Sequence, residues 1–401
     1  MQDIFIGRQP IYNQQLGVYA YELLFRTGAG AVTVQDGDAA TSQVIINAFN
    51  EIGLDRLVGE RLAAINITGR LLDQVEELPL VPGRVIFDLP RDLALTPARI
   101  DNIKRLRSKG YVIALDDFTY ADHLKPLLAL ADIIKIDTGP LRADDLKGHV
   151  RKLRRFGKAL LAEGVENMQE FDCLRDIGFN YYQGYFLSRP RVVRSQSLPT
   201  NRLAVMQLLS VLHDPDAELS AIEAVISRDV TLGYKLLKLM NSAFFGMSRQ
   251  IESVGRAVLL LGRRKLTGWA SMLALTAMDD QPAEAVRLAL VRARMCEQLG
   301  VAAGATDREN YFTVGLFSAL DVLMERALSG IIEPLPLTAE IKAALLEEQG
   351  RYGQALACVR AYEQADWTRV MFAGLSQAQI TEAWLSAVDW AGEVLGVVSR
   401  E

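Results

Sequence analysis

The sequence predicts an α/β protein in which a (β/α)8 barrel with an antiparallel first strand precedes an all-α domain. Short β-rich apolar runs alternate with polar helical stretches up to about residue 194, which is the pattern of a parallel sheet with crossover helices. These runs number eight, the count that closes a barrel. Beyond about residue 195, apolar residues recur with a helical period and strand signals become few.

The eight predicted strands are residues 3–12, 17–24, 62–67, 84–89, 111–117, 132–137, 159–165 and 181–186. Only residues 13–16 join the first two strands. Because this connection is too short for a parallel crossover, the two strands should form a hairpin and place one antiparallel pair in the barrel. The region is shorter than the roughly 250 residues of a typical barrel of this kind, so we expect some outer helices to be short or missing.

A change of composition near residue 197 predicts a domain boundary. Residues 188–201 read SRPRVVRSQSLPTN, a polar stretch with prolines that is typical of a connector. The length of 401 residues also favours more than one domain. We therefore predict a barrel domain over residues 1–196 and a helical domain over residues 197–401.

Composition and charge exclude several classes of protein. Apolar residues make up 50% and charged residues 23% of the chain, values close to the globular average that exclude disorder. The net charge is −5 and neither half is strongly basic, so we expect no nucleic-acid surface. The three cysteines show no CxxC spacing, which favours a reducing cytoplasm over a disulfide framework or a thiolate zinc site. The longest near-continuous apolar stretch, residues 269–278, has about half the length that spans a bilayer, so no membrane segment is expected.

Polar residues follow or close the predicted strands throughout the first half. They are Glu22, Asn66, Asp88, Asp116 with Asp117, Lys135 with Asp137, Glu163 with Glu166, and Gln183. In a barrel, the carboxyl ends of different strands converge on one face, where active sites are built. The sequence therefore predicts one polar site that several strands assemble.

The residue types at this site favour a hard divalent cation. Several carboxylates and an amide, with one lysine and without histidine or cysteine, provide the oxygen ligands that suit Mg²⁺ or Mn²⁺ better than zinc. Two such ions can clamp a phosphoryl group and generate hydroxide from water, which makes phosphodiester hydrolysis the natural chemistry. A single acid after a strand is more often a helix N-cap or a solvated loop charge. Adjacent carboxylates such as Asp116 and Asp117, however, repel each other unless a cation or hydrogen-bond donors lie between them.

These residues, in this order, resemble the EAL domain, the bacterial cyclic di-GMP phosphodiesterase family, over residues 1–195. The matching motifs are Tyr21-Glu22-Leu23-Leu24-Phe25-Arg26, Ile65-Asn66, Leu115-Asp116-Asp117-Phe118, Lys135-Ile136-Asp137, Ala162-Glu163-Gly164-Val165-Glu166 and Gln183-Gly184-Tyr185-Phe186.

The resemblance implies a role for each of these residues. The implied ligands of one metal ion, Mg²⁺ or Mn²⁺, are Glu22, Asn66, Asp88 and Asp116, with Asp117 as a ligand of the second. Lys135 and Glu163 would orient or deprotonate the attacking water. Arg26, Glu166 and Gln183 would hold the nucleotide or its supporting shell. Barrels of this family often pair, so the resemblance also implies a homodimer.

Three departures from the family pattern bear on hydrolysis. Where the family has Glu-x-x-Glu, this chain has Asp88-Leu89-Pro90-Arg91. The shorter Asp88 draws its carboxylate back by about 1.5 Å, whereas metal–ligand distances tolerate only about 0.2 Å. Arg91 puts a cation in place of a carboxylate that, in the family, supports the loop after the paired aspartates. In that loop, residues 119–123 lack the family's glycine, so we expect the loop to take a different shape.

The second half resembles the HDOD domain, a helical module related to HD-type phosphohydrolases, over residues 198–395. The matching segments are residues 226–230, 236–245, 251–254, 257–258 and 260–262. Enzymes of the HD type need several histidines and aspartates around a metal, yet His213 is the only histidine beyond residue 149. We therefore interpret His213 and Asp214 as a solvated loop or N-cap pair, and expect this domain to dock a protein partner without catalysis.

Three functional readings follow. In the first, a cytoplasmic signalling protein binds cyclic di-GMP in a divergent barrel that hydrolyses it slowly or not at all, and its helical domain docks a protein partner. In the second, the barrel is a working metal-dependent phosphodiesterase that yields the linear dinucleotide, and the helical domain regulates it. In the third, the chain is a regulatory scaffold without a ligand. Because all three share one fold, the site must decide among them.

Overall fold

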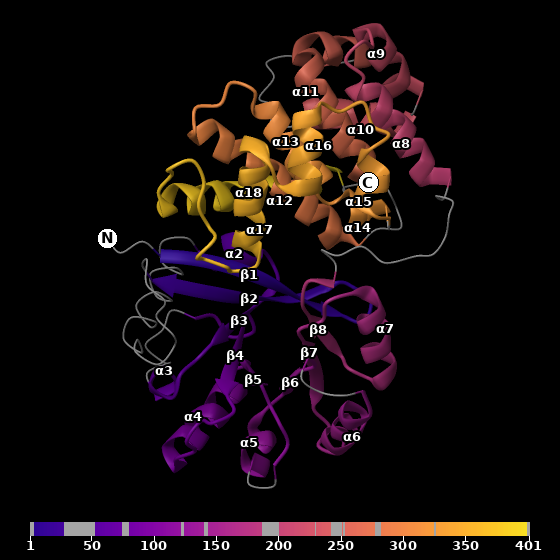
Figure 1. Ribbon diagram of the computed structural model, residues 1–401. Coiled ribbons are helices and arrows are strands. Elements are labelled where there is room, and N and C mark those ends of the chain that lie inside the picture. The colour runs from indigo at the N-terminus through magenta and orange to yellow at the C-terminus, as the bar shows by residue number, and fades with distance from the viewer. Residues whose placement is uncertain are drawn as a thin grey trace. The chain divides into compact units, whose positions relative to one another are not determined.

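The computed structural model describes residues 4–27, 53–73, 80–121, 124–139, 143–186, 200–228, 230–241, 251, 253–276, 282–324 and 326–398. The chain divides into two compact units, residues 1–187 and residues 188–401. Figure 1 shows the barrel of the first unit and the helices of the second. The domain boundary that we predict between residues 196 and 197 lies outside the described residues and stays a prediction.

The first unit is a closed barrel of eight strands in sequence order, as predicted. The strands are β1 Ile4–Asn13, β2 Val18–Thr27, β3 Leu62–Asn66, β4 Val85–Pro90, β5 Val112–Asp116, β6 Ile133–Asp137, β7 Ala159–Glu163 and β8 Tyr181–Gln183. Strand β1 runs antiparallel to both β2 and β8, whereas neighbouring strands from β2 to β8 are parallel. Strands β2–β8 therefore present their carboxyl ends at one face.

The turn between β1 and β2 explains the reversed first strand. The side-chain oxygen of Asn13 accepts hydrogen bonds from the backbone N–H groups of Gln15 and Gly17, at 3.0 and 2.9 Å. Leu16 takes a positive φ of 61°. An asparagine side chain closes a tight turn in this way because it mimics a backbone carbonyl. So short a connection returns the chain antiparallel, which confirms the predicted hairpin.

The helices around the barrel are unequal in length. They are α2 Leu54–Val58, α3 Gly69–Asp73, α4 Pro97–Ser108, α5 Lys125–Leu130, α6 Ala143–Arg154 and α7 Met168–Ile177. Helices α2 and α3 have five residues each and α5 has six, so part of the outer ring is short, as predicted. Helix α4 begins behind the N-cap Thr96 and α7 behind Asn167, and both caps accept a backbone hydrogen bond from the first turn.

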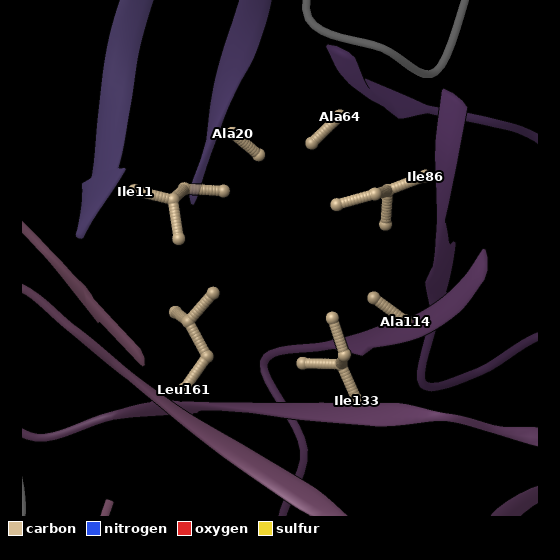
Figure 2. Close-up of a cluster of buried hydrophobic side chains, with 7 residues drawn as sticks. All are labelled: Ile11, Ala20, Ala64, Ile86, Ala114, Ile133 and Leu161. Carbon is tan, nitrogen blue, oxygen red and sulfur yellow. The ribbon is translucent and has the colours of Figure 1, made fainter. Parts of the chain in front are cut away.

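An apolar layer fills the barrel interior, as Figure 2 shows. Its residues are Ile11, Ala20, Ala64, Ile86, Ala114, Ile133 and Leu161, one from each of β1 to β7. None of them is more than 3% exposed. Three alanines leave room for four branched side chains, so the layer is a packed core and not a pore. We call this layer the apolar floor.

The second unit is helical throughout its described part, which confirms the all-α prediction. Its helices are α8 Thr200–His213, α9 Leu219–Arg228, α10 Val230–Met240, α11 Val254–Thr276, α12 Ala283–Ala302, α13 Arg308–Phe317, α14 Leu320–Met324, α15 Leu328–Ile332, α16 Ala339–Glu347, α17 Gly350–Glu363 and α18 Gln377–Val398. Helix α11 changes direction at Gly262, whose φ of 69° suits glycine. Among the described helices of the whole chain, none is long and apolar enough to cross a membrane.

The expectation of a solvated His213–Asp214 pair is wrong for the histidine. His213 ends α8, and its Nε2 lies 3.1 Å from the Ser271 hydroxyl, while its ring packs edge-on against Phe317 at 4.9 Å between centroids. Burial lowers the pKa of His213 to about 4. Asp214 behaves as expected, because its side chain caps a turn by accepting from the backbone N–H of Asp216. His213 is therefore a neutral packing residue at physiological pH.

Candidate functional site

The candidate site is a polar layer that lies directly above the apolar floor. Side chains two positions apart on a strand point to the same face. Each polar residue follows a floor residue by two positions on the same strand: Ala20 and Glu22, Ala64 and Asn66, Ile86 and Asp88, Ala114 and Asp116, Ile133 and Lys135, Leu161 and Glu163. These strands are parallel, so the polar layer forms at their carboxyl ends, where the sequence predicts the site.

Gln9 completes this layer, and sequence reasoning missed it. Because β1 runs in the opposite direction, its polar residue precedes the floor residue Ile11 by two positions. Gln9 lies opposite Glu22 in the strand register, and its Oε1 accepts a hydrogen bond from Gln183 Nε2 at 3.0 Å. The sequence feature that could have identified Gln9 is the short hairpin connection, because it fixes the register of β1 against β2.

Lys135 is the centre of the site. Its side chain is 1% exposed, and Nζ contacts four carboxylates. These contacts are Asp88 Oδ2 at 2.9 Å, Glu163 Oε1 at 3.0 Å, Glu22 Oε2 at 3.2 Å and Asp116 Oδ1 at 3.3 Å. Burial opposes the charged ammonium, but the surrounding carboxylates outweigh it and raise the pKa of Lys135 well above its ordinary value. One positive charge therefore holds together acids from four other strands.

Glu22 keeps its negative charge although it is buried. Burial acts to raise its pKa, but the charge of Lys135 and donated hydrogen bonds outweigh burial and lower it. Gln183 Nε2 donates to Glu22 Oε2 at 2.6 Å, and Asn66 Nδ2 donates to Glu22 Oε1 at 2.8 Å. Because Asn66 contacts Glu22 through its side-chain nitrogen, its side-chain oxygen Oδ1, the atom able to bind a cation, makes no hydrogen bond with Glu22.

Asp88 and Glu163 are less well compensated. Burial raises the pKa of Asp88 to about 6 and that of Glu163 to about 8, and Lys135 offsets only part of this rise. Asp88 Oδ1 is buried and finds no hydrogen-bond partner among the described residues. The layer thus holds more negative charge than one lysine balances, and near neutral pH it takes up protons to relieve the excess.

Asp117, the second of the two adjacent aspartates, forms an ion pair with Arg91 and not with Lys135. Asp117 is exposed, and its Oδ2 lies 3.1 Å from Arg91 Nη1, which also donates to the Asp117 backbone oxygen at 3.4 Å. Asp117 has a φ of 44°, so it takes a left-handed conformation without a glycine at the start of the loop. The repulsion expected between Asp116 and Asp117 is reduced because the two carboxylates contact different cations, Lys135 and Arg91.

The remaining predicted residues lie outside this cluster or outside the described side chains. Glu166 is exposed in the loop after β7, where its backbone N–H donates to Glu170. Asp137 is exposed and accepts from the backbone N–H of Gly139 at 3.0 Å. Arg26 lies on β2, but its side chain is outside the described part of the structure.

The donor set suits a hard divalent ion, although the present arrangement favours Lys135. Glu22, Asn66, Asp88 and Asp116 offer oxygen ligands, and the unpartnered Asp88 Oδ1 supplies a free lone pair. Within the residues that the structure describes, no three acidic, histidine or cysteine side chains are grouped as metal ligands, because the acids converge on the lysine ammonium. An ion at this face would therefore share these carboxylates with Lys135, and Asp117 suits a second ion less well while Arg91 neutralises it.

Comparison with known proteins matches both halves of the chain. Residues 9–190 match the EAL domain and residues 198–329 match the HDOD domain. The uncharacterized protein YuxH of Bacillus subtilis (strain 168) is 32% identical over 405 residues, which cover 98% of this chain and 99% of YuxH. The cyclic di-GMP phosphodiesterase CdgJ of Vibrio cholerae is 29% identical over 404 residues, which cover 98% of this chain and 94% of CdgJ.

A solved structure is similar to part of the chain. The calcium and cyclic di-GMP complex of BlrP1 from Klebsiella pneumoniae is 25% identical, with a TM-score of 0.38. The match covers 47% of this chain and 55% of that one, so the chain spans about half the length of that solved protein.

Proposed function

Because this chain belongs to the family of proteins in which an EAL domain is followed by an HDOD domain, we propose that it is a cyclic di-GMP signalling protein whose barrel binds the dinucleotide. CdgJ, which matches nearly the whole chain, is named a cyclic di-GMP phosphodiesterase. In this proposal the dinucleotide binds over the polar layer around Lys135, and its hydrolysis is slow or absent.

The ion pair between Arg91 and Asp117 carries the proposal of weak hydrolysis. The resemblance assigns Asp117 to a second metal ion, but a guanidinium nitrogen lies 3.1 Å from its carboxylate. The pair is exposed, and such pairs contribute less than about 1 kcal/mol, so the bond itself is a small obstacle. The larger obstacle is that a guanidinium stays charged at physiological pH and repels a divalent ion. In a two-metal site, the ions stabilise the attacking oxygen and the leaving oxygen of the reaction. Without the second ion, one of these two oxygens would lack this stabilisation.

Glu163 supports the same proposal. The resemblance gives Glu163 the task of taking a proton from water, but burial raises its pKa to about 8. At pH 7 it holds its own proton most of the time and is a poor base. Bound Mg²⁺ or Mn²⁺ would activate the water and neutralise the phosphodiester charge. In this site, Lys135 positions the Glu163 carboxyl group through the 3.0 Å contact.

Gln183 supports binding of the nucleotide. Its amide nitrogen donates to both Gln9 and Glu22, at 3.0 and 2.6 Å, so its orientation is fixed before a ligand arrives. Its Oε1 has no partner among the described residues, which leaves an acceptor for a ligand donor. With Gln183 we propose Arg26 and Glu166 as nucleotide contacts, as the resemblance implies.

A working phosphodiesterase is the second candidate, and one observation favours it. Most of the acids and amides that the resemblance assigns to catalysis lie together around Lys135. If the ions enter despite Arg91, the barrel would cleave cyclic di-GMP to the linear dinucleotide.

For the helical unit we propose a regulatory role in which it docks a protein partner without catalysis. The only histidine in this unit, His213, packs inside it against Ser271 and Phe317. From the resemblance alone, we also propose that two barrels pair into a homodimer. We place the protein in the cytoplasm because its three cysteines are free.

Calorimetric titration of cyclic di-GMP in Ca²⁺, followed by an assay for the linear product in Mg²⁺ or Mn²⁺, tests these readings. Saturable binding with little or no turnover is the expected result. Rapid turnover would establish the enzyme, and Glu163→Gln should then abolish it while binding persists. If neither nucleotide nor metal binds or shifts the thermal unfolding of the protein, the chain is a scaffold without a ligand and the proposal fails.

A further inference from the structure

The helical unit contains a cavity of about 250 Å³ whose walls come from α11, α12, α13 and α18. Three aromatic rings form its apolar part: Trp269, Phe312 and Trp390. The Trp390 ring lies 5.8 Å from the Trp269 ring and 6.0 Å from the Phe312 ring, between centroids. Gly268 helps to keep the cavity open, because it contributes no side chain to the wall.

The polar part of the cavity is mainly basic. Arg264 and Lys265 are exposed at its edge and have no acidic partner among the described residues. Arg294 lies over the Trp390 ring, 5.7 Å from its centroid, and pairs with Glu297 at 2.6 Å. With Arg308, four cations line the cavity against the two carboxylates of Glu297 and Glu309. Residues 201–401 contain 24 acidic and 19 basic residues, so this positive charge is a local feature of an acidic half.

We propose that this cavity binds a small aromatic anion. A ring would lie against the tryptophans, where aromatic groups stack favourably, and a carboxylate or phosphate would face Arg264 and Lys265. A cavity of about 150 Å³ holds benzene, so this one has room for a ring with a small charged substituent. Drug-sized ligands occupy about 300–1,000 Å³, so cyclic di-GMP, with two guanosine units, is too large. The ligand is therefore distinct from the one proposed for the barrel.

Trp390 adds to the cavity wall a ring from beyond the matched HDOD domain. It lies on α18, whereas the HDOD match ends at residue 329. Trp390 is 4% exposed, and its buried indole N–H has no acceptor among the described residues.

Titration of the full-length chain with phenyl phosphate and with phenylacetate tests the proposal, with tryptophan fluorescence and calorimetry as readouts. We expect at least one of the two anions to bind saturably with a Kd of about 1 mM or below, which is ordinary for a ligand of this size. Benzyl alcohol, which keeps the ring without the charge, and inorganic phosphate, which keeps the charge without the ring, should each bind about tenfold more weakly or worse. The comparison of the two anions identifies the preferred acidic group.

Two charge reversals on the same helix locate the binding. Arg264→Glu should weaken binding of the anion about tenfold or more. Arg256→Glu, a change at an exposed arginine that does not line the cavity, should leave it unchanged. The proposal is overturned if neither anion saturates at about 10 mM, if benzyl alcohol or phosphate binds as well as the anions, or if the two reversals act alike.

Discussion

Among the residues that the structure describes, each unit buries one cation, Lys135 in the barrel and Arg292 in the helical unit, and the two charges are balanced in opposite ways. In the barrel, the ammonium of Lys135 contacts four carboxylates at a site that also holds unpaired polar atoms. In the helical unit, Arg292 of α12 is 4% exposed and meets a single acid, Glu363 of α17. Arg292 Nε donates to Glu363 Oε1 at 2.9 Å, and Nη2 donates to Oε2 at 2.8 Å, while Nη1 reaches the Ser318 backbone oxygen at 3.3 Å.

This difference separates a structural pair from a functional cluster. The two parallel hydrogen bonds between Arg292 and Glu363 satisfy both groups and leave no excess charge. The barrel layer instead keeps surplus acid, as the raised pKa values of Asp88 (about 6) and Glu163 (about 8) indicate, and burial is the main cause of both. Such a surplus lowers stability and is typical of a site that awaits a cation or a ligand.

Replacement of Lys135 should have the largest effect, because it leaves four acids without their cation. We expect Lys135→Met to destabilise the barrel by about 3–5 kcal/mol and to abolish cyclic di-GMP binding. The loss should be smaller at about pH 5 than at pH 8, since Asp88 and Glu163 take up protons as the pH falls and relieve the repulsion. Hydrogen exchange of the barrel strands measures the effect.

The tryptophans provide the control for this variant. All four lie beyond residue 268, so tryptophan fluorescence follows the helical unit alone and should show an unchanged unfolding midpoint. Lys104→Met, at an exposed lysine on α4, should leave barrel exchange as in the wild type. Unchanged protection of the barrel in Lys135→Met would contradict the central role of this lysine.

Disruption of the pair between Arg292 and Glu363 should lower stability by a similar amount, and a second substitution should compensate for the loss. Arg292→Met leaves Glu363 buried without a partner, and we expect a loss of about 3–5 kcal/mol in the tryptophan-detected unfolding transition. The double change Arg292→Met with Glu363→Leu should recover most of this loss, since an apolar pair can replace a balanced ion pair. A double variant as unstable as the single one would mean that the pair does more than balance charge.

The stability of the helical unit should depend on pH through His213. In the unfolded chain a histidine binds a proton below about pH 6.5, whereas burial lowers the pKa of folded His213 to about 4. The unfolded state therefore binds the extra proton between these values, and stability should fall as the pH falls from 6.5 to 4, by roughly 1.4 kcal/mol per pH unit. In His213→Gln the tryptophan-detected transition should lose this slope. An equal slope in both proteins would assign the acid sensitivity to other groups.

The smallest effect should come from Gln9, which only orients Gln183. Gln9→Ala removes one acceptor, and we expect cyclic di-GMP affinity to fall by a few-fold, equivalent to about 0.5–1.5 kcal/mol. Gln15→Ala, in the exposed turn after β1, is the matched control. A variant that binds the dinucleotide as tightly as the wild type would remove Gln9 from the site.

The features of the fold that the sequence predicts are those that depend on periodicity. The eight strands and the polar residues at their ends follow from local alternation, because a floor residue such as Ala64 and a site residue such as Asn66 lie two positions apart on one face. Gln9 was missed because its place depends on the pairing of β1 with β2 rather than on its own strand. The contact of His213 with Ser271, 58 residues away, depends on tertiary packing that no local pattern reveals.

The pairing of Arg91 with Asp117 was also beyond prediction. The sequence shows that a cation replaces a carboxylate at residue 91, but the two residues lie in different loops. Their contact depends on the loop conformation, including the positive φ of Asp117. Cavities such as the one beside Trp390 likewise arise from four helices whose packing the sequence alone does not specify.

We propose that the barrel retains a dinucleotide site in which Asp88 and Arg91 limit hydrolysis. The most direct test compares the rate of cyclic di-GMP cleavage in Mn²⁺ between the wild type, Arg91→Glu, and the double variant Asp88→Glu with Arg91→Glu. We predict that the double variant, which restores Glu-x-x-Glu, cleaves at least about tenfold faster than the wild type, while affinity in Ca²⁺ stays similar. A wild type as fast as both variants, with binding intact in all three proteins, would contradict the proposed effect of Asp88 and Arg91.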